Sequence, residues 1–309
     1  MAEPKPYGVA DGSARAFDLD GYLKSRGAIV ERALAAVVAE SDGAATRLLE
    51  AMRYSLLAGG KRLRPILALA ACEAVGGALD DALPYACAME MIHTYSLIHD
   101  DLPCMDDDDL RRGRPTNHKV YGEAIATLAG DGLLTDAFKV LARSGAHAPA
   151  ALLETIAELA EAAGSAGMVG GQVIDLLGEG RELGLAELEV MHRRKTGALF
   201  VAAVCGGARL GGANAAQLAA LREYARALGL AFQVIDDLLD VEASTEAMGK
   251  RTNKDGARGK STYPALMGAG RARELAHNLI AEAAGALREF DRRADALRAL
   301  AAYAVEREL

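Results

Sequence analysis

The chain has 309 residues, of which 51% are hydrophobic and 25% charged, and its formal net charge is −8. This composition is typical of a soluble globular protein with a sizeable core, and its acidic balance disfavours a nucleic-acid partner. Four scattered cysteines without a CxxC pair disfavour a disulfide framework or a zinc site, and no apolar run approaches the ~18 residues of a membrane span. We therefore predict a cytoplasmic protein, in which an anionic substrate would need a local basic patch.

Apolar residues recur at helical spacing along most of the chain, whereas strand signals are nearly absent. The spacing is clearest over 218–239, where apolar residues follow alternating steps of three and four along one helix face. Residues 1–18 are predicted to form a flexible leader, and the folded domain is expected over 19–309. We predict a single all-α domain of roughly ten or more helices. Breaks between helices are predicted at 76–77, 113–115, 211–212 and 249–259.

The first motif is Gly-Gly-Lys-Arg-Leu-Arg-Pro over residues 59–65. It places three cations, Lys61, Arg62 and Arg64, beside a flexible turn and before an apolar helix. Backbone N–H groups at a helix start, together with cations, can bind a diphosphate. Such residues are also common on solvated surfaces, so this motif has little weight alone.

An acidic segment follows the next helical stretch. On a helical wheel His93 lies close to Asp100, and Pro103 is expected to end or distort the helix. That distortion would let Asp106 turn back toward Asp100, which a straight helix would not allow. The acids at 107–109 suit a solvated loop, and the whole run could be an acidic loop without function.

A second acidic cluster lies within the periodic segment. Gln233, Asp236, Asp237 and Asp240 fall within about 100° of one another on an ideal helix, with apolar residues on both sides. Carboxylates grouped on an apolar helix repel one another and resist desolvation. A hard divalent cation such as Mg²⁺ or Ca²⁺ removes both penalties. A simple charge run on a helix face is the alternative.

Further basic residues lie after or between the acidic clusters. They are Arg111-Arg112, Lys195 directly before Thr196, Lys250-Arg251 and Lys260. Acids combined with several cations indicate a metal-bridged polyphosphate rather than metal storage. No P-loop, kinase-type glycine loop or Gly-x-Ser-x-Gly motif is present, which disfavours nucleotide phosphoryl transfer. Diphosphate as a leaving group fits better, with metal ions stabilising its charge and an apolar helical cavity protecting a carbocation.

The order and spacing of these motifs resemble those of the short-chain trans-prenyl diphosphate synthases, most closely the bacterial farnesyl diphosphate synthases. The resemblance runs from about residue 30 to the C-terminus. It implies an all-α isoprenoid synthase bundle around a central active-site cavity, a homodimer, and three Mg²⁺ ions per active site. The matching segments are 59–65, 91–118, 170–176, 195–197, 232–240 and 259–268.

The resemblance also implies roles for individual residues. Asp100, Asp106 and Asp236 would bind Mg²⁺, with Asp101 supporting them. The allylic diphosphate would be held by Arg111, Lys195, Thr196, Gln233 and Lys250. Isopentenyl diphosphate would be held by Lys61, Arg64, His93 and Arg112. The residues expected to take part in catalysis are Asp100, Asp101, Asp106, Arg111, Lys195, Asp236 and Lys250, and Gln172 and Asp175 match a motif that lines the cavity.

The implied reaction condenses isopentenyl diphosphate with dimethylallyl and then geranyl diphosphate by ionisation, condensation and proton elimination. Tyr95 and Ser96 match positions that help to set the depth of the product cavity, and a bulky Tyr95 resembles farnesyl diphosphate synthases. The alternatives are a geranylgeranyl or geranyl diphosphate synthase, a terpene cyclase, or a non-catalytic synthase subunit. A cyclase is disfavoured because the second acidic cluster lacks the usual Asn, Ser and Glu mixture. A non-catalytic subunit is disfavoured because both clusters are intact.

Overall fold

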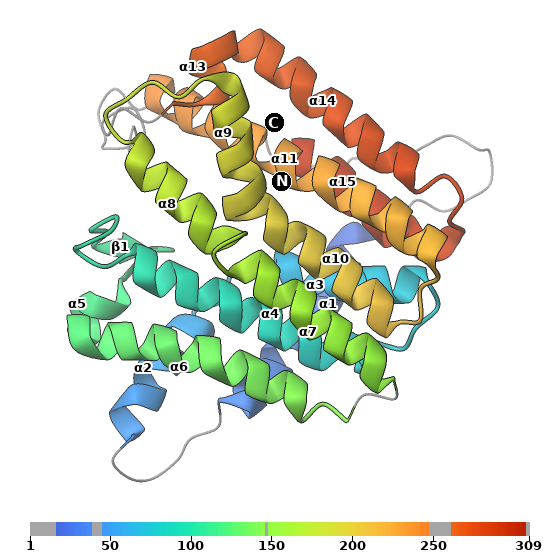
Figure 1. The fold of residues 1–309 in the computed structure, drawn as a ribbon, viewed down its shortest axis with the longest axis horizontal. Helices are drawn as coiled ribbons and strands as arrows, with labels where there is room; N and C mark the ends of the chain where they lie inside the picture. The colour runs from blue at the N-terminus through green and yellow to red at the C-terminus, as the bar shows by residue number, and fades with distance from the viewer. Residues whose placement is uncertain (1–16, 39–44, 146–147, 247–260, 307–309) are drawn as a thin grey trace.

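The computed structural model describes residues 17–38, 45–145, 148–246 and 261–306, and within them the chain is a bundle of helices with one small hairpin (Figure 1). The all-α prediction is confirmed. The long helices are α1 (Leu19–Val37), α2 (Thr46–Leu56), α3 (Leu63–Ala74), α4 (Leu79–Asp100), α6 (Glu123–Ala142), α7 (Pro149–Ala163), α8 (Met168–Gly178), α10 (Ala198–Leu210), α11 (Ala215–Glu246), α14 (Ala269–Ala286) and α15 (Asp295–Glu306). The shorter elements are α5 (Asn117–Tyr121), α9 (Leu185–His192), η1 (Arg193–Gly197), α13 (Tyr263–Met267), η2 (Arg292–Ala294), β1 (Leu110–Arg111) and β2 (Arg114–Pro115).

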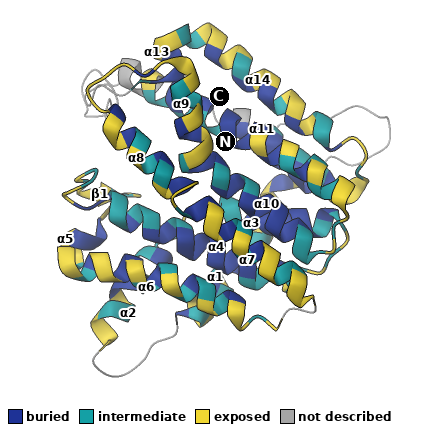
Figure 2. Cartoon of the chain, viewed as in Figure 1, coloured by how far each residue is buried: buried dark blue, intermediate teal, exposed yellow. Residues whose placement is uncertain are grey.

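The centre of the bundle is formed by α3, α4 and α10. Residues 65–72, 85–92 and 202–208 of these helices are buried throughout, as the dark helices at the centre of Figure 2 show. A helix that is apolar on every side is typical of such a central position. The α3 and α10 backbones come very close, because a Cβ at Gly207 would overlap the backbone of Ala68. Glycine therefore permits the tight packing of the core.

The periodic segment forms most of α11, and α14 packs along it. The apolar face predicted from the spacing is buried at Leu221, Ala225, Leu228 and Ile235. The predicted breaks at 76–77 and 211–212 separate α3 from α4 and α10 from α11. The break at 113–115 forms the turn of the hairpin and β2, whereas 249–259 lies outside the described residues.

Helix α1 begins at Leu19, and the Asp18 side chain caps it by accepting a hydrogen bond from Gly21 N–H at 2.9 Å. The domain boundary after residue 18 stays a prediction. The leader itself stays a prediction, because residues 1–16 lie outside the described residues. Among the helices that the structure describes, none combines the length and the apolar character that crossing a membrane requires.

Candidate active site

The first acidic segment turns back on itself just after α4. The Asp106 N–H donates a hydrogen bond of 2.7 Å to the carbonyl oxygen of Asp100. This turn follows Pro103, where the sequence predicted a distorted helix end. Asp100 and Asp106 consequently line one polar cavity of about 690 Å³.

The second acidic cluster lines the same cavity from α11. Asp236, Asp237 and Asp240 all contribute to its wall, more than 130 residues along the chain from Asp100. Asp237 has a structural contact as well, because its Oδ2 accepts a 2.9 Å hydrogen bond from Tyr263 N–H at the start of α13. The fold therefore brings the two predicted clusters together at one site.

The electrostatics of this cavity favour a cation. Burial raises the pKa of Asp100 to about 6, and the carboxylates of Asp106 and Asp101 act in the same direction, whereas Lys195 and Arg111 oppose the rise. Within the described ranges, no three acidic, histidine or cysteine side chains form a ready-made metal cage. A carboxylate set of this kind suits Mg²⁺, which binds to one or two carboxylates and takes its other ligands from water and substrate phosphates.

Asp101 holds Arg111. The Arg111 Nε donates to both Asp101 carboxylate oxygens at 2.8 and 2.9 Å, and its terminal nitrogen lies 2.6 Å from Oδ1. The Asp101 carboxylate is buried, whereas Arg111 lines the polar cavity. Asp101 thus supports the site by fixing a cation at its edge.

Several of the predicted site residues between 172 and 196 lie close to the acidic clusters. Lys195 and Thr196 lie on η1, a π-helical turn of a kind that is frequent at functional sites. The Lys195 ammonium is 2.6 Å from Asp175, and Gln172 donates a 2.8 Å hydrogen bond to Asp100. Lys195 therefore lies between the acidic cavity and the motif at 170–176.

Thr196 is hydrogen-bonded to Gln233. Its hydroxyl donates a 2.7 Å hydrogen bond to Gln233 Oε1, and the Gln233 amide nitrogen is 3.5 Å from Asp236. His192, which the sequence reasoning did not single out, places Nδ1 3.2 Å from the same Oε1 and stacks on Tyr263. The four-residue spacing between His192 and Thr196, which puts both on one helix face, was the available signal.

A second cavity, apolar and about 520 Å³, adjoins the first. It shares Leu97, Asp100 and Lys195 with the polar cavity, so a molecule can place a charged end in one and a hydrocarbon in the other. Its volume is within the usual range for small-molecule sites, about 300–1,000 Å³. The other residues lining it include Tyr95, Ser96, His99, Met168, Val173, Leu176 and Leu199.

Arg64 and His93 meet at one edge of the apolar cavity. Arg64 Nη1 is 3.4 Å from His93 Nε2, and the guanidinium lies over the Phe200 ring at 5.2 Å. Burial, together with the cation of Arg64, lowers the pKa of His93 well below its usual value, so the imidazole is neutral at neutral pH. Arg64 Nε is buried without a hydrogen-bond partner in the described part of the chain. A cation with an unsatisfied donor is suited to an anionic ligand.

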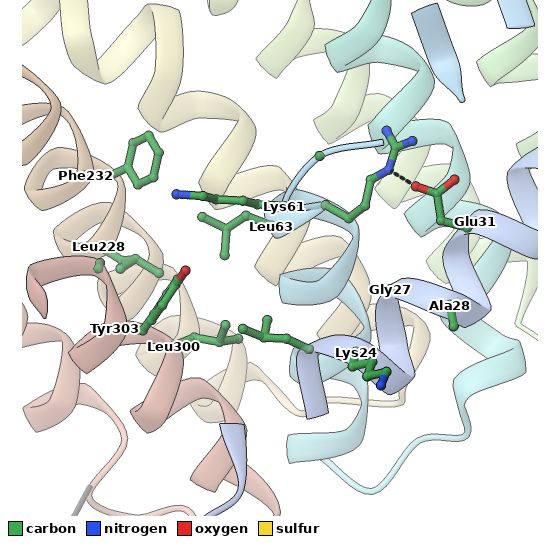
Figure 3. A pocket seen from close by; sticks show the side chains of 14 residues that line it. Lys24, Gly27, Ala28, Glu31, Lys61, Leu63, Leu228, Phe232, Leu300 and Tyr303 are labelled. Carbon is green, nitrogen blue, oxygen red and sulfur yellow. Dashed lines mark hydrogen bonds and ion pairs between the residues drawn. The ribbon is translucent and has the colours of Figure 1, made fainter. Parts of the chain in front are cut away.

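The structure does not bring Lys61 into a cavity with Arg64 and His93. Lys61 lines a third cavity of about 310 Å³, where its ammonium points toward Phe232, with Leu228 and Tyr303 nearby (Figure 3). The cation of Arg112 does reach the 59–65 motif, because its guanidinium donates to the carbonyl oxygen of Gly59.

Arg62, the third cation of that motif, has a structural role. Its side chain is only 2% exposed and pairs with Glu31 at 2.7 Å, drawn dashed in Figure 3, and with Glu90 at 2.5 Å. Arg62 is therefore engaged in buried ion pairs and is not one of the phosphate-binding cations that the motif predicts. Lys250 and Lys260 lie outside the described residues, so the predicted role of Lys250 stays a prediction.

Known proteins are similar to this chain in sequence and in structure. The family model for polyprenyl synthetase matches residues 45–302, and the chain belongs to that family. It is 50% identical to geranylgeranyl pyrophosphate synthase 7, chloroplastic, from Arabidopsis thaliana over 296 residues, which cover 94% of this chain and 85% of that protein. It is thus a prenyltransferase of isoprenoid biosynthesis that elongates trans-prenyl diphosphates.

Solved structures give the same assignment. The FPP/GFPP synthase of Zymomonas mobilis, in its apo form, superimposes with a TM-score of 0.85 at 40% identity, covering 93% of this chain and 99% of that one. The geranylgeranyl pyrophosphate synthetase of Pyrococcus horikoshii gives a TM-score of 0.86 at 32% identity, covering 94% and 98%. The family predicted from the motifs is confirmed. The Arabidopsis and Pyrococcus relatives are named for a geranylgeranyl product, whereas the Zymomonas protein is named an FPP/GFPP synthase.

Proposed function

We propose that this prenyltransferase adds isopentenyl diphosphate to allylic diphosphates until geranylgeranyl diphosphate is formed. The observation that carries the proposal is the joining of the two cavities at Asp100, which provides a charged end and a long apolar end for one substrate. The similarity to geranylgeranyl synthases over nearly the whole chain supports the twenty-carbon product. The farnesyl product expected from Tyr95 has less support.

The position of Tyr95 is compatible with the longer product. Its side chain is 6% exposed, and its ring packs edge-on against His99 with centroids 5.7 Å apart. The ring therefore lies in the cavity wall, against its own helix. In that position it narrows the cavity without closing it.

The carboxylate donors fit Mg²⁺, and we propose that Asp100, Asp106 and Asp236 hold three such ions together with the diphosphate oxygens. Bound Mg²⁺ supplies positive charge that stabilises the leaving diphosphate. Lys195 and Arg111 add fixed cations at the same cavity, and Asp101 keeps Arg111 in position. These contacts favour the state in which negative charge collects on the diphosphate.

The remaining steps follow from the two ends of the site. When the bond between carbon and the bridging oxygen breaks, the allylic cation is left in the apolar cavity, whose mostly apolar lining offers few groups that could react with it. The double bond of isopentenyl diphosphate, held through Arg64 and His93 with Arg112 nearby, attacks that cation. A proton then leaves the new carbon skeleton for the departed diphosphate, which restores a double bond.

One assay tests the function. Purified protein is incubated with Mg²⁺, isopentenyl diphosphate and, separately, dimethylallyl, geranyl and farnesyl diphosphate, and products are identified by chromatography. We expect elongation of all three primers and a twenty-carbon main product, with no activity in EDTA. Farnesyl diphosphate that accumulates and is not elongated would indicate a farnesyl diphosphate synthase. A lack of condensation with every primer would refute the function.

Tyr95→Ala is expected to lengthen the product, because it removes a ring from the wall of the apolar cavity. The share of product beyond twenty carbons should rise, as measured by chromatography after complete turnover. An unchanged product in Tyr95→Ala would rule out a length-setting role for this ring.

Asp101→Asn is expected to lower kcat/KM by at least about tenfold, because a hydrogen bond to a charged group is worth ~1.5–3 kcal/mol and ~1.4 kcal/mol equals tenfold. The change keeps the shape of the side chain but weakens its hold on Arg111. Asp108→Asn is the control, since Asp108 lies 3.9 Å from the same guanidinium. Equal losses in both variants would contradict the specific role of Asp101.

The homodimer and the cytoplasmic location remain predictions from the sequence. Size-exclusion chromatography with light scattering measures the mass of the protein in solution. A mass equal to one chain at micromolar concentration would refute the homodimer.

A further inference from the structure

His99 forms the wall of the apolar cavity between Asp100 and Tyr95. It lies in the last turn of α4, and its side chain is 28% exposed. The imidazole Nε2 is 3.0 Å from the carbonyl oxygen of Thr127 on α6. Because a carbonyl oxygen only accepts hydrogen bonds, Nε2 carries the proton and donates it. This hydrogen bond holds the ring against α6, where the exposed Asp131 carboxylate also lies 3.9 Å from Nε2.

The space that this ring occupies exists because residue 130 is glycine. A Cβ built on Gly130 of α6 would lie within 2.9 Å of three imidazole atoms of His99, namely Nε2, Cδ2 and Cε1. Separations under 3.0 Å are essentially never seen for real Cβ atoms. The φ angle of Gly130 is not positive, so the residue is not needed for an unusual backbone conformation. Its missing side chain is what makes room for the imidazole.

A displaced imidazole can move toward the apolar cavity or toward the exposed Asp131, whose carboxylate lies 3.9 Å from Nε2. The backbone of α6 lies behind the ring, and the Tyr95 ring packs against it edge-on at an interplanar angle of 76°. On the cavity side are the residues across from it, among them Met105, Val169 and Val173. Closely packed interiors have little spare volume, so a ring that leaves the glycine space takes room from whatever fills the cavity.

We propose that His99, seated in the space left by Gly130, is a specificity-determining residue that sets how long a hydrocarbon the cavity accepts. The inference rests on the proposed function, because it concerns the growing prenyl chain. His99 would keep the cavity wide as long as its ring stays against α6. The pair would then act on product length together with Tyr95, one helical turn further from Asp100.

Gly130→Ala tests this directly. The added methyl group is expected to push the imidazole into the cavity and to raise the ratio of shorter to twenty-carbon product about tenfold or more, the discrimination that one methylene gives in an apolar pocket. The double variant His99→Ala/Gly130→Ala removes the displaced ring, so it should return the ratio to that of the unchanged protein. Product ratios are read by chromatography, and the first condensation with dimethylallyl diphosphate is measured in parallel.

Two further variants keep the test decisive. Gly132→Ala, on the same helix, is the control, because its Cβ would face the Met52 side chain at 3.0 Å and not the cavity. Its product ratio should not change. His99→Trp leaves Gly130 intact but carries a ring too large for the space, and it should also shorten the product, which covers the case in which Gly130→Ala does not fold.

Each outcome distinguishes the possible explanations. An unchanged ratio in folded Gly130→Ala and in His99→Trp would overturn the inference. A shortened product that persists in the double variant would also overturn it, because the effect would then come from a shift of α6. If the unchanged protein condenses no primer at all, the proposed function fails first, and the inference falls with it.

Discussion

Asp236→Ala is expected to lower kcat by about 10³-fold or more, because a catalytic metal ion contributes several kcal/mol and each ~1.4 kcal/mol is a factor of ten. Asp236 lines the polar cavity from α11, opposite the acids that follow α4. The same loss is expected for Asp100→Ala, whose half-buried carboxylate lines the same cavity as Asp106. Turnover is measured with saturating primer over a range of Mg²⁺ concentrations, so that weakened metal affinity and lost chemistry are separated.

The unfolding temperature in EDTA shows whether the lower turnover of Asp236→Ala comes from a lost metal ligand or from a less stable protein. Grouped carboxylates repel one another, so the metal-free variant should be at least as stable as the unchanged protein. Asp109→Ala is the matched control from the same acidic run, because Asp109 is exposed and pairs with Lys119 at 2.7 Å. It should keep nearly full turnover. Near-normal turnover in Asp236→Ala would mean that this cluster does not hold a metal ion that the reaction needs.

The second acidic cluster was the part of the site that the sequence predicted best. Its geometry depends on one helix, so the spacing of Gln233, Asp236 and Asp240 was enough to place them on one face. The first cluster needed one additional assumption, a turn at Pro103, and the hydrogen bond between Asp106 and Asp100 shows that turn. Local periodicity and one local break therefore accounted for both acidic walls of the cavity.

The basic residues were harder to predict because their partners are distant in sequence. Arg62, Arg64 and Lys61 stand within four residues of one another, yet they face Glu90, His93 and a separate cavity respectively. No periodicity in the chain indicates those directions, since they depend on how α3 packs against its neighbours. The positive φ of 48° at Arg62 adds a local turn that spacing rules do not anticipate for arginine.

Product length was the property that the sequence predicted least well. The bulk of Tyr95 alone favoured a farnesyl product, but the ring lies against His99 in the wall of the cavity. The size of a cavity depends on the packing of neighbouring helices, and Gly130 on α6 leaves the space that the His99 imidazole occupies in the cavity wall. A residue type by itself therefore does not fix the volume available to the chain.

Glu90→Gln is expected to lower the free energy of unfolding by about 3–5 kcal/mol, the usual cost of removing one partner of a buried ion pair. Glu90 and Arg62 side chains are each 2% exposed and 2.5 Å apart, so the guanidinium would lose its buried counter-charge. Chemical denaturation followed by circular dichroism measures the change. Glu31→Gln is the control, because Glu31 is 37% exposed and a pair of that kind contributes within about 1 kcal/mol.

The double variant Arg62→Leu/Glu90→Leu separates stability from function. Replacing a buried ion pair with apolar residues is often neutral or stabilising, so the double variant should be more stable than Glu90→Gln. Arg62 also bonds the carbonyl oxygen of Leu56 at 2.6 Å and starts α3 in a left-handed conformation, which fixes the direction of Lys61 and Arg64 on either side. We therefore expect KM for isopentenyl diphosphate to rise in the stable double variant, while KM for the allylic primer changes little. An unchanged KM would mean that the buried pair serves only the fold.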